Sequence, residues 1–206
     1  FYSSARVMIH PTALINPGAE IAADVSIGAF AVIEDKVQIS EGCRIDPHTQ
    51  ILSGTRLGSA TSVGRAAVLG GDPQDLSFDP ATESFLEVGK NNTIREHVTL
   101  HRSASPGGAT RVGDDNFLMV GAHMGHDAIL GDHCVVANNC LLAGHVVVGD
   151  HCFLGGGSVY HQFLRIGDHV MAQGNGAFSK DIPPFTMAAL YNQLVGLNSV
   201  GLRRAG

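Results

Sequence analysis

The chain has 206 residues, of which 44% are hydrophobic, and a formal net charge of −6 at pH 7. This length and composition allow one sizeable buried core, although the chain contains no tryptophan. The acidic balance argues against a nucleic-acid partner, because no basic stripe is available to displace counterions from phosphates. No apolar stretch is long enough to span a bilayer and no signal-peptide pattern is present, so we expect a cytoplasmic protein without an integral membrane segment.

An aliphatic residue recurs at every sixth position from Ile9 to Leu69. The same period resumes at Val88, one residue out of phase, and later runs on to Phe178 with few departures from aliphatic character. A six-residue period fits neither an α-helix nor a two-sided strand, so each hexad is predicted to form one short strand and one corner. Three hexads would make a triangular lap of eighteen residues. The sequence therefore predicts an all-β solenoid, shaped as a triangular prism, over residues 8–182.

The repeat fails at about residues 71–86 and again at 102–110, and both segments contain proline and glycine. We predict that they are loops projecting from the prism, and long excursions from a regular scaffold usually carry function. Two consecutive prolines at 183–184 are expected to end the solenoid, because proline cannot donate to a β-ladder. Residues 183–206 are then predicted to be an extended tail leading toward a helical domain beyond the chain. Residues 1–7 precede the repeat and are either a natural extension or a cloning remnant.

A lap of eighteen residues also predicts which side chains stack. It brings His126, His145 and His161 to one corner of the prism, in neighbouring positions and separated by the interstrand distance of about 4.8 Å. His123 lies just upstream of that corner, and His101 joins the column if the second loop adds six residues to its lap. The three hexads of the corner have unlike sequences, so inheritance of the repeat does not explain their histidines.

Three other histidines share a repeated Gly-Asp-His phrase, which repeat inheritance does explain. We expect solvated turn residues at these positions, His133, His151 and His169.

Several histidines in one cleft permit two chemistries. Neutral imidazoles could ligate zinc or a similar ion. Alternatively, one imidazole takes a proton from a hydroxyl nucleophile while the others hold the substrate. Asp127 directly follows His126 and would orient its ring if the chain turns a corner between them. The Gly144 amide, beside this column, is a candidate oxyanion donor, because glycine lets a reacting carbonyl approach the backbone closely.

Five runs of residues stand out within the pattern: Gly-Asp-Pro-Gln-Asp-Leu (71–76), Ile-Arg-Glu-His-Val-Thr-Leu-His-Arg (94–102), Ala-His-Met-Gly-His-Asp (122–127), Asn-Asn-Cys-Leu-Leu-Ala-Gly-His-Val (138–146) and Val-Tyr-His-Gln-Phe (159–163). Together they resemble the UDP-N-acetylglucosamine O-acyltransferase family, whose reaction is the first step of lipid A synthesis. The similarity covers about residues 8–206. The resemblance implies a left-handed parallel β-helix, an exception to right-handed crossover, assembled as a homotrimer with active sites between neighbours.

The resemblance implies transfer of a 3-hydroxyacyl chain from acyl carrier protein to the glucosamine 3-hydroxyl of UDP-N-acetylglucosamine. No metal is implied, and no cofactor beyond the phosphopantetheine that carries the acyl donor. His126 matches the general base, Asp127 the residue behind it and Gly144 the oxyanion amide. Gly174, together with Met171, matches the acyl-length ruler, where a glycine implies a long chain. The positions that match substrate-binding residues are Gln74, His101, His123, His145, His161, Gln162, Asn198 and Arg204.

Three alternatives stay open. The same base could acylate the amine of a 3-amino sugar. Some hexapeptide prisms are metalloenzymes of the carbonic anhydrase type, although the spacing of His123 and His126 is not that of this family. The third alternative is a scaffold or a catalytically impaired solenoid, because the helical domain that the resemblance implies does not follow Gly206.

Overall fold

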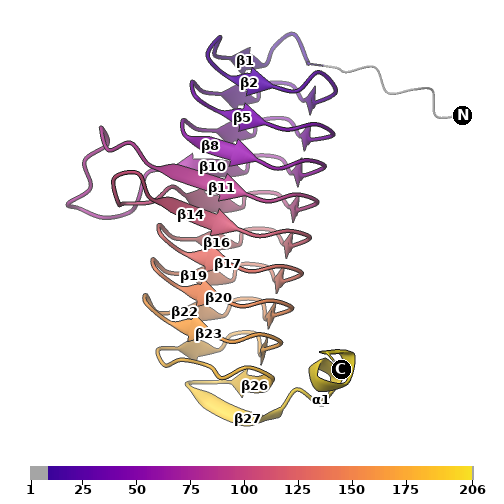
Figure 1. Cartoon of the computed structure of the whole chain (residues 1–206), viewed down its shortest axis with the longest axis vertical. Helices are drawn as coiled ribbons and strands as arrows, with labels where there is room; N and C mark the ends of the chain where they lie inside the picture. Colours follow the sequence, from indigo (N-terminus) through magenta and orange to yellow (C-terminus); the bar gives the residue numbers. More distant parts are fainter. Residues whose placement is uncertain (1–8, 206) are drawn as a thin grey trace, which may run out of the picture.

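The computed structural model describes residues 9–205, so the predicted extension at 1–7 lies outside the described residues. Short strands, most of them two residues long, alternate with turns and stack into a prism (Figure 1). Each strand pairs in parallel with the strand three elements further along, except at the C-terminal end. One regular lap contains eighteen residues, since Ile15 pairs with Ile33 and Ile33 with Ile51. The all-β solenoid predicted from the six-residue period is confirmed.

Three sheets form the faces of the prism. Sheet 1 contains β1 (Leu14–Ile15), β4 (Val32–Ile33), β7 (Gln50–Ile51), β10 (Val68–Gly71), β13 (Thr99–His101), β16 (His123–Met124), β19 (Leu141–Leu142), β22 (Val159–Tyr160) and β25 (Ala177–Phe178). Sheet 2 contains β2 (Glu20–Ile21), β5 (Gln38–Ile39), β8 (Thr55–Leu57), β11 (Phe85–Val88), β14 (Ala109–Val112), β17 (Ile129–Leu130), β20 (Val147–Val148) and β23 (Arg165–Ile166). Sheet 3 contains β3 (Ser26–Ile27), β6 (Arg44–Ile45), β9 (Ser62–Val63), β12 (Thr93–Ile94), β15 (Phe117–Leu118), β18 (Val135–Val136), β21 (Phe153–Leu154), β24 (Met171–Ala172), β26 (Thr186–Ala189) and β27 (Gln193–Leu197).

The core is a set of aliphatic columns inside the prism. In a typical two-residue strand the second side chain points inward and is buried, while the first points outward, as successive strand residues must. The inward residues of neighbouring laps are in register, so Ile94 lies on Leu118 and Leu118 on Val136. Each hexad therefore covers the aliphatic side chain of the hexad below it, which is why the six-residue period is nearly unbroken.

Replacing Ile39 by alanine is expected to lower the free energy of unfolding by about 2–5 kcal/mol, because the side chain is buried and leaves a cavity. Gln38 precedes it in β5 and points outward, so Gln38→Ala serves as the matched control, with an expected change within about 0.5 kcal/mol. Urea denaturation of the two variants measures the difference. Equal effects would contradict the inward and outward assignment.

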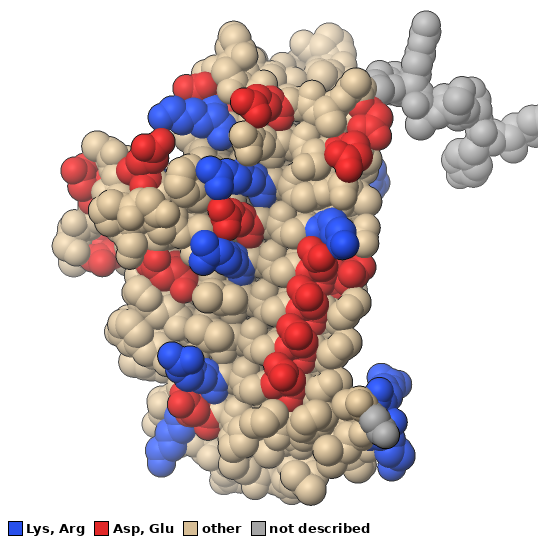
Figure 2. Space-filling model, viewed as in Figure 1, with Lys and Arg blue, Asp and Glu red and all other residues tan. Residues whose placement is uncertain are grey.

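An aspartate ladder runs along the corner that joins sheet 2 to sheet 3. The backbone N–H of Asp114 donates to Asp132 Oδ1 at 2.7 Å, and the same contact repeats from Asp132 to Asp150 and from Asp150 to Asp168. Figure 2 shows a column of acidic side chains on this part of the surface. The carboxylates thus satisfy turn N–H groups that the β-ladder leaves unpaired.

Both predicted loops are present. The first covers residues 72–84 between β10 and β11, and the second covers residues 102–108 between β13 and β14, where the two protrude together from the prism (Figure 1). Leu100 pairs with Met124, twenty-four positions later, which confirms that the second loop adds six residues to a lap.

The predicted end of the solenoid at residue 182 is wrong. Ile182 still bridges to Ile166, and β26 still pairs in parallel with β24. The prolines at 183–184 lie in a corner, where the ladder bonds are made by the flanking N–H groups of Ile182 and Phe185. Within the predicted tail, residues 183–205 are also not simply extended chain, because β27 folds back antiparallel on β26 and the helix α1 (Ser199–Ala205) follows.

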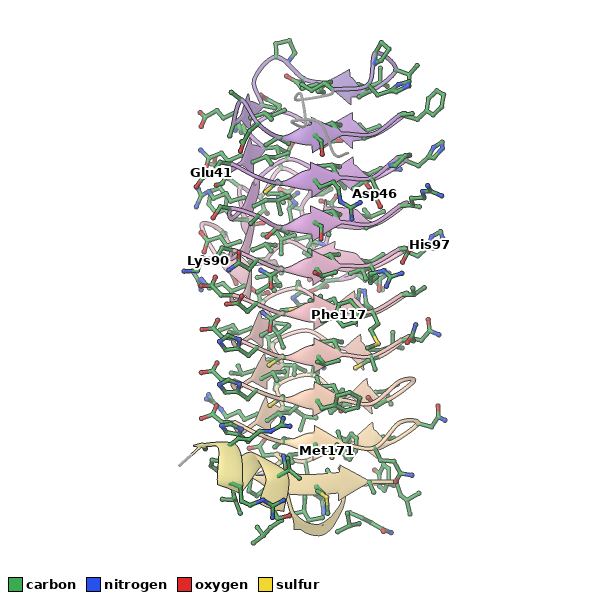
Figure 3. All side chains as sticks on the ribbon, turned by 90° about the vertical axis from the view of Figure 1, so that its right-hand side faces the viewer. Glu41, Asp46, Lys90, His97, Phe117 and Met171 are labelled. Atoms are coloured by element: carbon green, nitrogen blue, oxygen red, sulfur yellow. The ribbon has the colours of Figure 1, made fainter. Side chains whose placement is uncertain are left out.

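The three outer faces differ in character. Sheet 2 presents charged side chains, with Glu87 bridging Arg56 at 2.8 Å and Arg111 at 3.1 Å. Sheet 3 is apolar toward its C-terminal end, where Phe117 and Met171 lie on one face (Figure 3). Sheet 1 is apolar in the same laps through Leu141 and Val159. Within residues 9–205, no helix has the length and apolar character needed to cross a bilayer.

Candidate active site

The turn from β16 to β17 places an imidazole against a carboxylate. Asp127 occupies the left-handed region with φ of 59°, a conformation that aspartate tolerates better than most residues. This corner lets adjacent side chains meet, so that His126 Nδ1 lies 2.8 Å from Asp127 Oδ2. The side chains are only 17% and 13% exposed. The predicted Asp-His pair and the corner that it requires are both present.

Hydrogen bonds hold Asp127 in its charged form. Burial by itself would raise the pKa of this carboxyl, but hydrogen bonds from Ser103, His126 and the Ala104 amide outweigh it and lower the pKa below its ordinary value. An ionised carboxylate only accepts hydrogen bonds, so the proton between the pair sits on Nδ1 of His126. In the neutral ring the other nitrogen, Nε2, then carries a free lone pair, as a general base requires.

Gly144 lies one lap from His126 and faces its Nε2. A Cβ added at Gly144 would lie 2.8 Å from Nε2 and 2.9 Å from Cε1 of that ring, so only glycine leaves room for the imidazole. The Gly144 N–H donates to no acceptor within residues 9–205. A free N–H beside the lone pair of a base is the arrangement that an oxyanion site needs.

The predicted histidine column is only partly present. The His145 ring is edge-on to that of His126, with centroids 5.1 Å apart, and its Nε2 lies 3.8 Å from Asp127 Oδ2. His161 is at the same corner, but it is exposed, and among the described residues its ring bonds only to the neighbouring Gln162 carbonyl. Eighteen-residue steps from His126 lead to Gly144 and Gln162, so Gln162 rather than His161 occupies the stacked position.

His101 and His123 form a second pair below the first. Their rings meet edge to face with centroids 4.8 Å apart, and Thr99 Oγ1 lies 2.7 Å from His123 Nδ1. Burial lowers the pKa of His101 to about 4, helped by the neighbouring histidines, and burial also lowers the pKa of His123. Both rings are therefore neutral at pH 7 and offer hydrogen bonds rather than charge.

These groups surround one hollow of about 400 Å³. The first loop contributes Gln74 to its wall and β22 contributes Val159. Among the predicted site residues, the hollow is lined by Gln74, His101, His123, His126, Gly144 and Gln162.

The remaining predicted residues lie elsewhere on the chain. Asn198, Arg204 and Met171 line a second hollow of about 910 Å³ beside the corner that joins sheet 2 to sheet 3. Asn198 caps α1, since its Oδ1 accepts the Gly201 N–H and its Nδ2 donates to the His169 carbonyl at 2.8 Å. At Gly174 a Cβ would lie 2.9 Å from the Gly156 carbonyl oxygen, so this glycine permits close stacking of two laps.

The prediction of solvated turn residues missed a feature of the second hollow. Three histidine rings stack face to face there at 4.7–4.8 Å, and Phe185 continues the stack. The three rings, His133, His151 and His169, line the second hollow.

Sequence reasoning also missed residues that support the Asp-His pair. Phe163 stacks on His145 with centroids 4.6 Å apart, and an eighteen-residue step from His145 would have located it. Ser103 hydrogen-bonds the Asp127 carboxylate, and Thr110 Oγ1 accepts the Asp127 N–H at 2.8 Å. Ser103 lies in a loop outside the repeat, so no periodic signal could have found it.

A metal-binding reading of the cluster fits less well. Among the described residues, ligand atoms of His126, Asp127 and His145 lie within 4.8 Å of one another, close enough for three zinc ligands. Both Asp127 oxygens already accept hydrogen bonds, one of them from His126 Nδ1. A metal ion would have to break that bond, so the donor set suits an Asp-His catalytic pair better.

Comparison with known sequences assigns the chain to a family. Residues 109–144 match the hexapeptide-repeat model of bacterial transferases, and residues 181–206 match domain 2 of UDP-N-acetylglucosamine O-acyltransferase. An acyl-[acyl-carrier-protein]–UDP-N-acetylglucosamine O-acyltransferase from Thermodesulfovibrio yellowstonii is 44% identical over 96% of this chain and 77% of its own length. One from Campylobacter concisus is 37% identical over 95% and 76%. The chain belongs to the UDP-N-acetylglucosamine O-acyltransferase family.

Solved structures of this acyltransferase family have the same fold. LpxA from Acinetobacter baumannii superimposes with a TM-score of 0.92 at 40% identity, over 96% of this chain and 77% of that one. The UDP-N-acetylglucosamine acyltransferase from Campylobacter jejuni gives 0.91 at 39% identity, over 97% and 78%. The solenoid is therefore the left-handed parallel β-helix that the resemblance implies.

Proposed function

We propose that this acyltransferase moves a 3-hydroxyacyl chain from acyl carrier protein to the 3-hydroxyl of UDP-N-acetylglucosamine. The proposal is supported by one observation above all: a charged Asp127 fixes the tautomer of His126, whose free Nε2 faces the Gly144 backbone inside a hollow. The names of the relatives supply the donor and the acceptor.

The reaction follows from these positions. His126 Nε2 takes the proton of the sugar hydroxyl as its oxygen attacks the thioester carbonyl, and the Gly144 N–H binds the oxyanion of the tetrahedral intermediate. The intermediate collapses with cleavage of the C–S bond, and the imidazolium returns its proton to the departing thiolate. Asp127 stays ionised throughout and stabilises the imidazolium. The neutral rings of His101 and His123 and the amides of Gln74 and Gln162 hold the acceptor sugar.

The site is proposed to be completed in a homotrimer. Asn198 and Arg204, which match nucleotide-binding positions, line the second hollow rather than the one around His126. The outer faces of sheets 1 and 3 are apolar in the laps that carry both hollows, through Leu141 and Val159 on sheet 1 and Phe153 and Met171 on sheet 3. Packing sheet 1 of one copy on sheet 3 of the next would bury these faces and bring the two hollows together.

The donor brings its own carrier group, so the proposed reaction uses no metal and no separate cofactor. The apolar wall of the second hollow, which includes Phe153 and Met171, is proposed to hold the acyl chain. Gly174 does not line this hollow, and its proposed role as acyl-length ruler, with a glycine favouring a long chain, rests on the resemblance alone. We also propose that the enzyme works in the cytoplasm. His145 and His161 are proposed to contact the substrate from the rim of the site.

The proposal is tested by assaying acyl carrier protein loaded with chains of different length against UDP-N-acetylglucosamine and its 3-amino analogue. We expect faster acylation of the hydroxyl acceptor, a preference for long chains, and sedimentation of the active species as a trimer. Preference for the amine would favour the alternative acceptor. A monomer without transfer activity would favour the impaired solenoid.

A further inference from the structure

The second loop delivers a buried hydroxyl to the catalytic carboxylate. Ser103 is 0% exposed, although it belongs to a loop that projects from the prism. Its Oγ hydrogen-bonds Asp127 Oδ1, and the neighbouring Ala104 N–H donates to Oδ2 at 3.1 Å. His126 Nδ1 also donates to Oδ2. Each oxygen of Asp127 therefore has a donor from this loop, in addition to the imidazole that it orients.

The direction of the Ser103 hydroxyl proton follows from its neighbours. Its Oγ accepts the Ser105 N–H at 3.0 Å, so the single hydroxyl proton must serve an acceptor elsewhere. Two acceptors are in reach, Asp127 Oδ1 and the Ser105 carbonyl oxygen, and the latter is 3.4 Å away. An ionised carboxylate is the stronger acceptor, and here it is also the nearer one. The proton therefore points to Asp127.

The loop that carries this hydroxyl is firmly held. Ser84 Oγ donates to the Ser103 carbonyl at 2.6 Å, and the Ser103 N–H donates to the Phe85 carbonyl at 3.2 Å. The adjacent Arg102 side chain joins the two loops, because its guanidinium bonds to Asp72 and to the Pro80 carbonyl, each at 2.9 Å. Ser103 is thus fixed relative to the prism before any substrate binds.

We infer that Ser103 is a positioning residue for acyl transfer. Its hydroxyl fixes the Asp127 carboxylate and shares its charge, which keeps His126 Nε2 aimed toward Gly144 and lets the imidazolium give up its proton to the leaving thiolate. Ser103 touches no reacting atom and acts through Asp127. The inference rests on the proposed function, in which His126 is the general base.

The test is Ser103→Ala in the whole chain, with Ser105→Ala as the matched control. Ser105 is in the same loop but exposed, and its side chain donates no hydrogen bond among the described residues. Loss of a hydrogen bond to a charged group is expected to lower kcat about tenfold for Ser103→Ala, with KM for UDP-N-acetylglucosamine changed less than about twofold. Ser105→Ala should keep both constants.

The pH profile separates positioning from a structural role. A carboxylate with one donor fewer holds the imidazolium more strongly, so the acidic limb of the kcat/KM profile should move to higher pH in Ser103→Ala. Loss of packing alone would not move this limb. A Ser103→Ala enzyme with wild-type kcat and an unchanged acidic limb would overturn the inference.

Two further variants keep the result interpretable. Ser103→Cys retains a weak donor of similar size, so it should recover part of kcat and part of the shift in the acidic limb. If Ser103→Ala does not fold, as its thermal midpoint would show, Ser103→Gly removes the same donor, and wild-type kinetics in that folded variant would refute the role. Should His126→Ala keep full turnover, the proposed base itself fails, whatever Ser103→Ala shows.

Discussion

His126→Ala is expected to lower kcat by about two to four orders of magnitude, the usual contribution of a positioned general base. The variant lacks the nitrogen that combines a fixed tautomer with a lone pair facing Gly144. Binding of the nucleotide sugar should change much less, because the other groups that surround the hollow remain in place. Steady-state assays with acyl carrier protein as donor measure both constants.

A matched control for His126→Ala is His10→Ala. His10 is exposed in the first described lap, and its imidazole bonds within its own turn, to Thr12. The His10→Ala substitution removes an imidazole from the same prism without touching the hollow, so the kcat of this variant should match that of the wild type. Turnover of His126→Ala within a factor of about three of wild type would exclude a role as base, since a general base contributes about a hundredfold or more.

The fold was predictable because a short-range sequence pattern determines it. An inward aliphatic at every sixth position defines the lap, and the lap sets the register in which Met124, Leu142 and Tyr160 stack. The prolines at 183–184 led to the wrong prediction that the solenoid ends at residue 182. Proline interrupts a β-ladder only where it occupies a strand position that must donate a hydrogen bond. Here the two prolines fall in a corner, between ladder donors at Ile182 and Phe185, and so remove no bond that the coil uses.

Counting along the repeat could predict the site only where the site follows the repeat, whereas Gln74 in the first loop was predicted by the family resemblance. Counting in eighteens places Gly144 on His126 and His145 on Asp127, and the structure brings these four residues together. Counting in eighteen-residue steps could not find Ser103, because it lies in an inserted loop whose path depends on contacts with the other loop. The same counting could not place Asn198 and Arg204, because the C-terminal tail departs from the six-residue period. Both residues lie at the second hollow, beside the corner that joins sheet 2 to sheet 3.

Gly144→Ala is expected to lower kcat about a hundredfold or more, although it adds only a methyl group. The new Cβ would lie 2.8 Å from His126 Nε2, inside any normal contact distance. The imidazole is tied to Asp127 through Nδ1, so it can yield only by breaking that bond or by swinging Nε2 away from the acceptor hydroxyl. Displacement of a reacting group by about 1 Å can cost a hundredfold in rate.

A double-mutant cycle with His126→Ala identifies the cause of the loss in Gly144→Ala. Alanine keeps the backbone N–H at position 144, so the oxyanion donor is still present and the methyl group acts mainly through the imidazole. Once that imidazole is removed, the same methyl group has nothing to displace, and adding Gly144→Ala should lower the residual kcat less than about threefold. If the two losses simply add, the methyl group acts on the substrate or on the amide rather than on the base. Wild-type kcat in the single Gly144→Ala variant would mean that the ring and the backbone are not packed as closely as the structure places them.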